Sequence, residues 1–578
     1  MEKTRQLRLY YEACIPVGLL VVGSYRHGFP PHNSDATKSL AASLPGALAL
    51  AVAAVQLYMR LSWRRMSDGM GMLPGTQAAM YRPQADSGSV WGGLLVLLAL
   101  FALNIDAGAA AGPSADGLGT YGAWVVGVAM AWAFTLAVLS AQIRSHNRPT
   151  LGVVGGAGVL SLGYAFASLG LAGGAMAGML LVLGAAGVQH VATRVLLEML
   201  PRSFTLGEAA AITQGAILAA IDLAIRLFRR GAEYPDHSWQ MYTLVLESVG
   251  LGLLLLVCAL PRVFSSSSRM NTRDSGSPVA DMSRFCGLSG FAALGALGLI
   301  AFVSHANPVR WALVAVLGSR SSLLMLCYWV LLLLCGTLFY SRGISSQVAN
   351  SQNKLVLHLK RKAYHILAVL LFAPGFAYTP LLLHLGFVVA LVAFVGAEAV
   401  RALGIGPWAP AIDRFMRRFT DTRDAGQIVT SHFYLLFGCA LPVWLGSSSS
   451  AACLAGVLSL GIADTAASLV GIHFGSRKWP STPKTIEGTA AFVGGLFIAV
   501  EFVYLIAPSE NGALGNMAMC VVLGLLEALT EQNDNLVIPL TMYSAATMLH
   551  HSDGSLVHWI PALVVAAVLA IPSLFIAR

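Results

Sequence analysis

Apolar runs recur along the whole chain at a length that suits membrane spans. A helix needs about 20 predominantly apolar residues to cross a bilayer. Runs of this kind lie near residues 40–60, 90–110, 121–141, 151–170, 173–190, 208–227, 240–260, 285–304, 321–340, 363–383, 384–401, 427–446, 450–472, 488–507, 514–530, 536–550 and 557–577. The pattern predicts an all-α, polytopic integral membrane protein with roughly 15 to 18 transmembrane helices, of which short runs such as 536–550 are half-helices.

A shorter apolar run at residues 13–24 precedes these spans. It resembles the apolar part of a signal peptide, but no clean A-x-A cleavage site follows, and Arg26 and His27 come at once. We expect an uncleaved first span or a half-span there.

Basic residues between the runs predict the orientation, because Lys and Arg concentrate in cytosolic loops. Alternate counting through the spans places the basic loops together on one side, at residues 60–65, 144–148, 262–273 and 354–362. Loops with almost no Lys or Arg fall on the other side, at 111–120, 305–308 and 447–450. The run from Arg226 to Arg230 is an exception, so that helix is interfacial or the count is off by one there.

The same count brings four loops of the C-terminal half to the cytosolic side, at residues 341–362, 402–426, 473–487 and 531–535. Nearly all the unusual polar residues of that half lie in or beside them, so we expect a site on this face. We therefore divide the chain into residues 1–340, a multi-helix membrane region of unclear role, and residues 341–578, which carry the candidate chemistry. In the first region, Ser203 or Thr205 could cap the helix that follows, and a structural elbow is the better reading of this stretch.

Composition supports the membrane class and excludes others. Of the 578 residues, 56% are hydrophobic and only 11% are charged, whereas a soluble domain has about 25% charged residues. The net charge of +9 comes from short basic loops, which suit anionic lipid, and we find no nucleic-acid-binding module. None of the eight cysteines forms a C-x-x-C pair, so neither a zinc site nor a disulfide framework is indicated.

The stretch from Gly461 to Gly488 carries the strongest chemical signal. It begins with Asp464, an acid inside an apolar run, and such acids are functional candidates by default. It continues through Gly471 and Gly475 into a polar turn. That turn carries Arg477, Lys478 and Lys484, and the stretch closes on Thr485, Glu487 and Gly488. An acid that holds a cation, small residues and lysines are what a metal-bound polyphosphate requires. The alternative is an ordinary loop with cytosolic lysines.

Two other groups of residues are candidates. Glu527, Glu531 and Asp534 are spaced i, i+4 and i+7, which would place three acids on one face of a helix, where a cation such as Mg²⁺ would relieve their repulsion. The alternative is a polar helix end before Pro539. Arg361 and His365 are one helical turn apart and could contact phosphate. The alternative is a basic anchor at the membrane surface, which is the better reading for Lys362.

These residues together resemble a family. The stretches are Arg361-Lys-x-x-His365, Thr420-Asp421-x-Arg423-Asp424-x-Gly426 with Ser431-His432, Asp464-Thr465-x-x-Ser468, Lys478-Trp-Pro-x-Thr482-x-Lys484-Thr-x-Glu487-Gly-Thr489, and Glu527-x-x-Thr530-x-Gln532-x-Asp534. In this order they resemble the dolichol kinases, polytopic enzymes of the endoplasmic reticulum that use CTP and are related to phytol kinases. The first 340 residues match mainly in hydropathy, with residues 203–208 as a weaker echo. Pro483 and Ser431 depart from the usual family residues, a basic residue and Thr.

The resemblance implies a CTP-dependent dolichol kinase with its site facing the cytosol and dolichyl phosphate for glycosylation as its product. It implies CTP binding by residues 478–489, of which we name Lys478, Trp479, Pro480, Thr482, Lys484, Thr485, Glu487, Gly488 and Thr489. We assign Mg²⁺, or another divalent cation, to Asp464 and Asp534, assisted by Glu531 or Glu527. Arg361 or Arg423 could stabilise the transferring phosphoryl group, and the general base is Asp464, Asp534 or His365.

Three rival functions remain. A cytidylyltransferase-like enzyme would transfer CMP rather than phosphate, and a phytol or other polyprenol kinase would differ only in its lipid. A secondary transporter would also have broken helices and intramembrane acids, but it should show inverted repeats, and we find none. No P-loop occurs and no G-x-G-x-x-G follows a predicted strand, so a soluble-type nucleotide fold is not supported.

Overall fold

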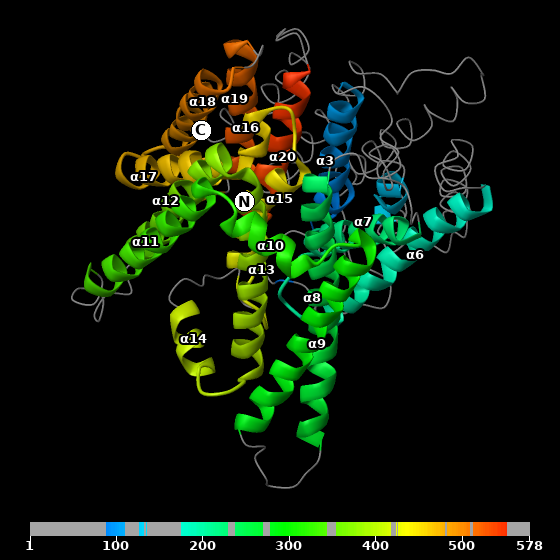
Figure 1. The fold of residues 1–578 in the computed structure, drawn as a ribbon. Coiled ribbons are helices and arrows are strands. Elements are labelled where there is room, and N and C mark those ends of the chain that lie inside the picture. Colours follow the sequence, from blue (N-terminus) through cyan, green and yellow to red (C-terminus); the bar gives the residue numbers. More distant parts are fainter. Residues whose placement is uncertain are drawn as a thin grey trace, which may run out of the picture. The chain divides into compact units, whose positions relative to one another are not determined.

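The computed structural model describes residues 82, 88–109, 126–131, 134–135, 175–228, 237–269, 278–343, 354–417, 424, 426–479, 482–508 and 512–551. Regular structure in these ranges is helical, apart from one isolated β-bridge between Lys478 and Thr485. The all-α prediction is therefore confirmed for the described chain. Figure 1 shows the helices, with the sequence running from blue to red.

The helices up to residue 403 are α3 (Ser89–Ala109), α6 (Ala175–Met199), α7 (Leu206–Phe228), α8 (His237–Arg269), α9 (Pro278–Ser304), α10 (Pro308–Leu317), α11 (Arg320–Gly343), α12 (Lys354–Tyr378) and α13 (Pro380–Leu403). Those that follow are α14 (Ala409–Met416), α15 (Ser431–Leu445), α16 (Ser450–Cys453), the π-helix η4 (Val457–Ala463), α17 (Asp464–His473), α18 (Ile486–Ile506), α19 (Ala513–Leu529) and α20 (Asp534–His550).

Five described helices are long and apolar enough to cross a membrane, and a sixth span results if α10 and α11, which meet at an angle of 80°, are counted as one. The five spans are Leu206–Ala224, Met241–Leu260, Ala280–Ser304, Pro380–Leu403 and Ile486–Ile506. The protein is thus a multi-pass membrane protein. The predicted runs at 13–24, 40–60, 151–170 and 557–577, and most of 121–141, lie outside the described residues, so the total of 15 to 18 spans stays a prediction.

Contacts divide the chain into two units. The first comprises Met1–Ile221, Ala425–Gln427 and Phe437–Arg578, and the second comprises Asp222–Asp424 and Ile428–Leu436. The boundary predicted at residue 340 falls within the second unit and stays a prediction. Each unit is described by itself.

In the second unit, α8 packs on α9 and α13, and α12 packs on α11 and α13. Ion pairs stabilise the C-terminal end of α13. Arg401 donates two hydrogen bonds to the Glu398 carboxylate, at 2.6 and 2.9 Å, and a third to Asp413 at 3.2 Å. Glu398 also accepts the Val429 amide at 2.7 Å. Their i, i+3 spacing on α13 places Glu398 and Arg401 close enough to form this pair.

The first unit is built around α20. Residues 535–549 of this helix are all buried, as expected for a helix that is apolar on every side. It packs on α3, α16, η4 and α19, while α18 packs on α17 and α19 (Figure 1). Two glycines here allow close backbone approach: a Cβ at Gly438 would lie 2.1 Å from the Asn535 carbonyl oxygen, and one at Gly456 would lie 2.0 Å from the Gly438 carbonyl oxygen.

Candidate active site

Asp464 lies at the junction between the π-helix η4 and α17. Its amide donates to the carbonyl of Ser459, five residues back, which is the hydrogen bond that defines a π turn. The predicted apolar helix over 450–472 is therefore interrupted by a wider turn just before its acid. Because π turns rotate the residues that follow them, η4 sets the direction in which Asp464 projects. Such turns are frequent at functional sites.

A short hairpin follows α17 and leads into α18. The amide of Trp479 donates to the Lys484 carbonyl at 2.9 Å, and the amide of Ile486 donates to the Arg477 carbonyl at 2.8 Å. The side chains of Arg477 and Lys478 are exposed, whereas that of Lys484 is partly buried. The hairpin therefore presents some of its basic side chains outward and directs Lys484 into the unit.

Lys484 lies where the hairpin meets the junction between α19 and α20. Its Nζ is 2.5 Å from the Glu527 carboxylate, 2.6 Å from the Glu527 carbonyl oxygen and 3.7 Å from the Asp534 carboxylate. Asp464 also interacts electrostatically with Lys484. Four residues that the sequence singled out separately therefore form one cluster, which we call the acid–lysine cluster: Asp464, Lys484, Glu527 and Asp534.

The charge state of Lys484 follows from its surroundings. Burial by itself lowers the pKa of an ammonium group, but the carboxylates of Glu527, Asp534 and Asp464 outweigh this effect. The pKa of Lys484 is therefore raised above its ordinary value of 10.5. The ammonium stays charged at neutral pH and partly neutralises the three acids.

The prediction that one helix carries Glu527, Glu531 and Asp534 on one face is wrong, whereas the break predicted between the runs at 514–530 and 536–550 is confirmed. Helix α19 ends at Leu529, and α20 begins at Asp534 with Asn533 as its N-cap. Side chains in the intervening residues replace the helical hydrogen bonds: Thr530 Oγ1 accepts the Gln532 amide at 3.1 Å, and Asn533 Oδ1 accepts the Asn535 amide at 3.1 Å. The polar break therefore precedes Asp534. A polar helix end before Pro539, the alternative given above, is thus present at the end of α19, and Pro539 itself lies inside α20.

Other residues of the predicted CTP-binding segment are engaged with one another. Glu487 accepts the Ser476 hydroxyl at 2.6 Å and the Arg477 amide at 3.2 Å, so it holds the hairpin. Thr485 caps α18 by accepting the Gly488 amide at 3.1 Å. Trp479 is buried and donates its indole N–H to the Thr489 hydroxyl at 2.9 Å.

Thr482 accepts the Lys484 amide at 3.0 Å and so shapes the end of the hairpin. The glycines of this segment pack against protein. A Cβ at Gly475 would lie 2.2 Å from the Gly471 carbonyl oxygen, and one at Gly488 would lie 2.9 Å from the Thr485 hydroxyl. They bring α17 and the start of α18 together.

An apolar cavity of about 390 Å³ lies between α18 and α19, next to Trp479. It is lined by Trp479, Ile486, Thr489, Ala490, Val493, Gly494, Val521 and Leu525. The cavity therefore adjoins both the predicted CTP-binding segment and the helix that carries Glu527.

The described residues do not include a ready-made metal cage, because no three His, Cys, Asp or Glu side chains among them are arranged to hold an ion. Mg²⁺ in phosphate-transfer sites takes one or two carboxylates together with phosphate and water oxygens. Asp464 and Asp534 can supply such a set, whereas Glu527 is already bonded to Lys484. Glu531 lies in the break between α19 and α20. The metal ligands stay a prediction.

The remaining predicted site residues are not placed in this cluster. His365 is a buried residue of α12 in the second unit, one turn after Arg361 on the same helix. The side chain of Arg361, and Arg423 and Pro480 altogether, lie outside the described residues. Asp424, from the same stretch as Arg423, accepts the amides of Thr430 and Ser431 at 3.0 and 3.1 Å and caps the start of α15.

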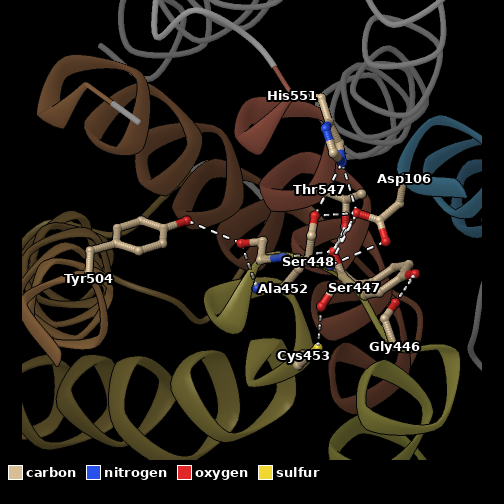
Figure 2. Close-up of polar contacts among 11 residues, drawn as sticks. Asp106, Gly446, Ser447, Ser448, Ala452, Cys453, Tyr504, Thr547 and His551 are labelled. Atoms are coloured by element: carbon tan, nitrogen blue, oxygen red, sulfur yellow. Dashed lines mark hydrogen bonds and ion pairs between the residues drawn. The ribbon is translucent and has the colours of Figure 1, made fainter. Parts of the chain in front are cut away.

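A second polar cluster, which the sequence analysis missed, lies at the other end of α20 (Figure 2). Asp106 accepts the Ser448 hydroxyl at 2.5 Å and lies 2.8 Å from Nε2 of His551, and Ser447 is 3.1 Å from the Thr547 hydroxyl. A helix of 17 residues is about 25 Å long, so this cluster is far from Asp534. Nε2 of His551 approaches both Asp106, at 2.8 Å, and the Ser448 hydroxyl, at 3.3 Å. In a catalytic triad the acid and the nucleophile bond different ring nitrogens, so this arrangement is not a triad. It fastens the loop after α15 to α3 and α20.

Comparison with known proteins decides the family. A family model described as dolichol kinase matches residues 45–436, more than half of the chain. The chain belongs to the dolichol kinase family. It is 35% identical over 381 residues to dolichol kinase EVAN of Arabidopsis thaliana, and 30% identical over 370 residues to the human dolichol kinase. No solved structure matches.

The coverage of these relatives is partial. The matches span 61% and 60% of this chain and 66% and 65% of the two relatives, just under two thirds of their length. The bovine dolichol kinase is 28% identical over 519 residues, which cover 85% of this chain and 90% of the relative. The family model already matches from residue 45, within the first 340 residues, whose resemblance to the family lay mainly in hydropathy. The N-terminal region therefore carries dolichol kinase sequence as well.

Proposed function

We propose that this protein is a CTP-dependent dolichol kinase, which transfers the γ-phosphate of CTP to the terminal hydroxyl of dolichol. Membership of the dolichol kinase family supports the reaction class. The observation that carries the assignment of the site is the acid–lysine cluster, where Lys484 approaches Glu527 and Asp534. Phosphoryl transfer depends mostly on positioning and charge neutralisation, and this cluster offers both.

The hairpin and the start of α18 would hold the nucleotide. The hairpin carries three cations. Arg477 and Lys478 are exposed, and Lys484 lies on the inner side. The N-terminus of α18 adds amide groups and the positive end of the helix dipole, which favour bound phosphate. Glu487 keeps the hairpin attached to that helix through Ser476 and Arg477.

A divalent cation, Mg²⁺ in the simplest case, would be held by Asp464 and Asp534, with Glu531 or Glu527 assisting. When bound, it would neutralise charge on the phosphates of CTP. The two aspartates are the better ligands because Glu527 already accepts two contacts from Lys484 through its carboxylate and its carbonyl.

The transfer itself forms one bond and breaks one. The hydroxyl oxygen of dolichol bonds to the γ-phosphorus, the bond from that phosphorus to the β,γ-bridging oxygen breaks, and CDP leaves. The hydroxyl proton passes to a carboxylate, for which Asp464 and Asp534 are the candidates in the cluster. Lys484 stabilises the negative charge on the transferring group.

The acceptor lipid needs an apolar path to this site. We assign the first isoprene units of dolichol to the cavity between α18 and α19, because the cavity is apolar and adjoins the hairpin at Trp479. The rest of the lipid would remain in the bilayer. We place the enzyme in the endoplasmic reticulum membrane with the hairpin on the cytosolic side, as the distribution of basic loops predicts.

The test uses membranes that contain the protein, dolichol, Mg²⁺ and CTP labelled on either the α- or the γ-phosphate. Lipid labelled only from the γ position supports the kinase. Label from the α position would indicate a cytidylyltransferase and would overturn the proposal. Absence of both labels in folded protein would favour the transporter. Phytol and shorter polyprenols as competing acceptors separate a dolichol kinase from a kinase for other lipids.

A further inference from the structure

A hydrogen bond links the N-terminal region to the loop that precedes Asp534. The Thr205 hydroxyl donates to Oε1 of Gln532 at 3.1 Å, across 327 positions of sequence. Thr205 is 2% exposed and Gln532 is 1% exposed, so water does not compete for this bond. Gln532 lies in the four-residue break between α19 and α20, two positions before Asp534. The bond therefore acts on the segment that sets the position of a predicted catalytic acid.

Thr205 is itself held in place by a capping box. Its hydroxyl accepts the Glu208 amide at 3.2 Å, and its own amide donates to Oε2 of Glu208 at 3.0 Å. Of the two cap candidates, Ser203 and Thr205, it is Thr205 that caps α7. A lone pair of the Thr205 hydroxyl accepts the Glu208 amide, so the hydroxyl proton is available for Gln532. The cap thereby fixes the direction in which Thr205 donates.

A buried ion pair between Arg82 and Glu208 holds the capping box in place. Arg82 Nη2 lies 2.5 Å from Oε1 of Glu208, and their side chains are 2% and 4% exposed. The Arg82 amide also donates to the Phe204 carbonyl at 2.9 Å. Glu208 therefore uses one carboxylate oxygen for Arg82 and the other for Thr205. Removing either charge would leave the other buried without its partner.

Backbone packing confines Gln532 from a third direction. Gly88 has φ +68°, and a Cβ there would lie 2.4 Å from Oε1 of Gln532 and 3.1 Å from the Thr205 hydroxyl. A Cβ at Gly207 would in turn lie 1.8 Å from the Gly88 carbonyl oxygen. Because of these contacts, the Gln532 side chain cannot move toward Gly88. The hydrogen bond from Thr205 therefore holds the Gln532 amide in one position.

A further stretch that carries the family resemblance reaches the same place. Gly426, which follows Asp424 in the sequence, packs directly on Ser203, because a Cβ at Gly426 would lie 2.3 Å from the Ser203 hydroxyl. Residues 203–208, Gly426 and residues 530–535 thus meet, although they are remote in sequence. The stretch that the sequence favoured as an elbow is a contact point for two candidate motifs.

We propose that Arg82, Thr205, Glu208 and Gln532 are positioning residues of the active site: the buried Arg82–Glu208 pair fixes Thr205, and Thr205 fixes the 530–533 loop that places Asp534 beside Lys484. The inference rests on the proposed kinase function for its effect on activity. It assigns a task to the N-terminal region, which supplies three of the four residues. Loss of the bond lets the loop move, and a displacement of about 1 Å at a catalytic acid lowers the rate by about 10²-fold.

The experiment uses the full-length protein in lipid nanodiscs and compares Thr205→Val with Thr213→Val. Thr213 is a matched control because it is a buried threonine of the same helix, but its hydroxyl bonds the Ala209 carbonyl and Thr193. Hydrogen–deuterium exchange of residues 530–535 is measured first. Thr205→Val should accelerate this exchange and lower kcat by about 10- to 100-fold with little change in the KM for CTP. Thr205→Ser should restore both, and Thr213→Val should change neither.

A double-mutant cycle with Gln532→Met completes the test. If the bond carries the effect, adding Thr205→Val to Gln532→Met causes little further loss, whereas independent effects would multiply. Unchanged exchange in Thr205→Val, or an equal change in Thr213→Val, would overturn the inference. Should Thr205→Val fail to fold, Gln532→Met applies the same exchange test from the other partner. Absence of phosphoryl transfer in the wild type would refute the proposed function alone, because exchange reports on the loop without activity.

Discussion

The Nζ atom of Lys484 lies 2.5 Å from the carboxylate of Glu527, although the two residues belong to a hairpin and to a different helix 43 positions later. Asp534 is 3.7 Å from the same nitrogen. The lysine therefore stands among acids as well as beside the predicted phosphate-binding segment. We therefore propose two roles for Lys484: it stabilises the arrangement of the acids through these contacts, and it neutralises a phosphate in the proposed kinase site.

Substitution at Lys484 separates these two roles. Lys484→Met should lower kcat by about 10²-fold or more, because a cation beside the transferring phosphate is lost, and should also lower the melting temperature. Adding Glu527→Gln should recover much of the melting temperature, since the unpaired buried carboxylate is removed, but not the activity. Kinetics and thermal unfolding of the single and double variants check this. Recovery of activity in the double variant would show that Lys484 serves structure alone.

The stabilisation by Lys484 should not change with pH over the physiological range. The pKa of Lys484 is raised in the folded protein, so its contribution is fully present below the ordinary value of 10.5 and is lost only as pH rises through the higher folded value. The difference in melting temperature between wild type and Lys484→Met should therefore not decline from about pH 6 to about pH 9. A difference that declines within this interval would contradict the raised pKa.

Spans of the fold could be predicted from sequence because apolar length alone decides whether a helix crosses a bilayer. The run at 488–507 corresponds closely to α18, and 384–401 lies within α13. The π-helix before Asp464 gave no such signal, since its residues are apolar like those of an ordinary helix. Its register depends on packing against α18 and α20 rather than on composition.

The individual residues of the candidate site could be predicted from the sequence, but the contacts between them could not. Asp464, Lys484, Glu527 and Asp534 stood out because charges are costly in apolar surroundings. The break before Asp534 was predicted as the loop at residues 531–535, and Asn533 is a good N-cap residue, but the i, i+4, i+7 spacing of the acids argued for a continuous helix. The hydrogen bond from Thr205 to Gln532 had no readable signal in the sequence, because nothing in either segment specifies a partner 327 positions away.

Two aspartates of the first unit should respond in opposite ways to the same substitution. Asp464→Asn should abolish phosphoryl transfer with little effect on thermal stability. Asp106→Asn should retain kcat per folded molecule but lower the stability by about 1 to 3 kcal/mol, because charge-assisted bonds to His551 and Ser448 are weakened. Activity normalised to folded protein, together with thermal unfolding, distinguishes them. Full activity in Asp464→Asn would remove this residue from the site.

The cavity between α18 and α19 offers a test of where the lipid lies. Val521 lines the cavity, so Val521→Phe should fill part of it and raise the KM for dolichol by about tenfold, which corresponds to about 1.4 kcal/mol, while the KM for CTP stays unchanged. Ile498→Phe is the matched control, because Ile498 is 70% exposed on α18 and outside the cavity lining. Steady-state kinetics with each substrate varied in turn provide the measurement. An unchanged KM for dolichol in Val521→Phe, or a parallel rise in the KM for CTP, would place the lipid elsewhere.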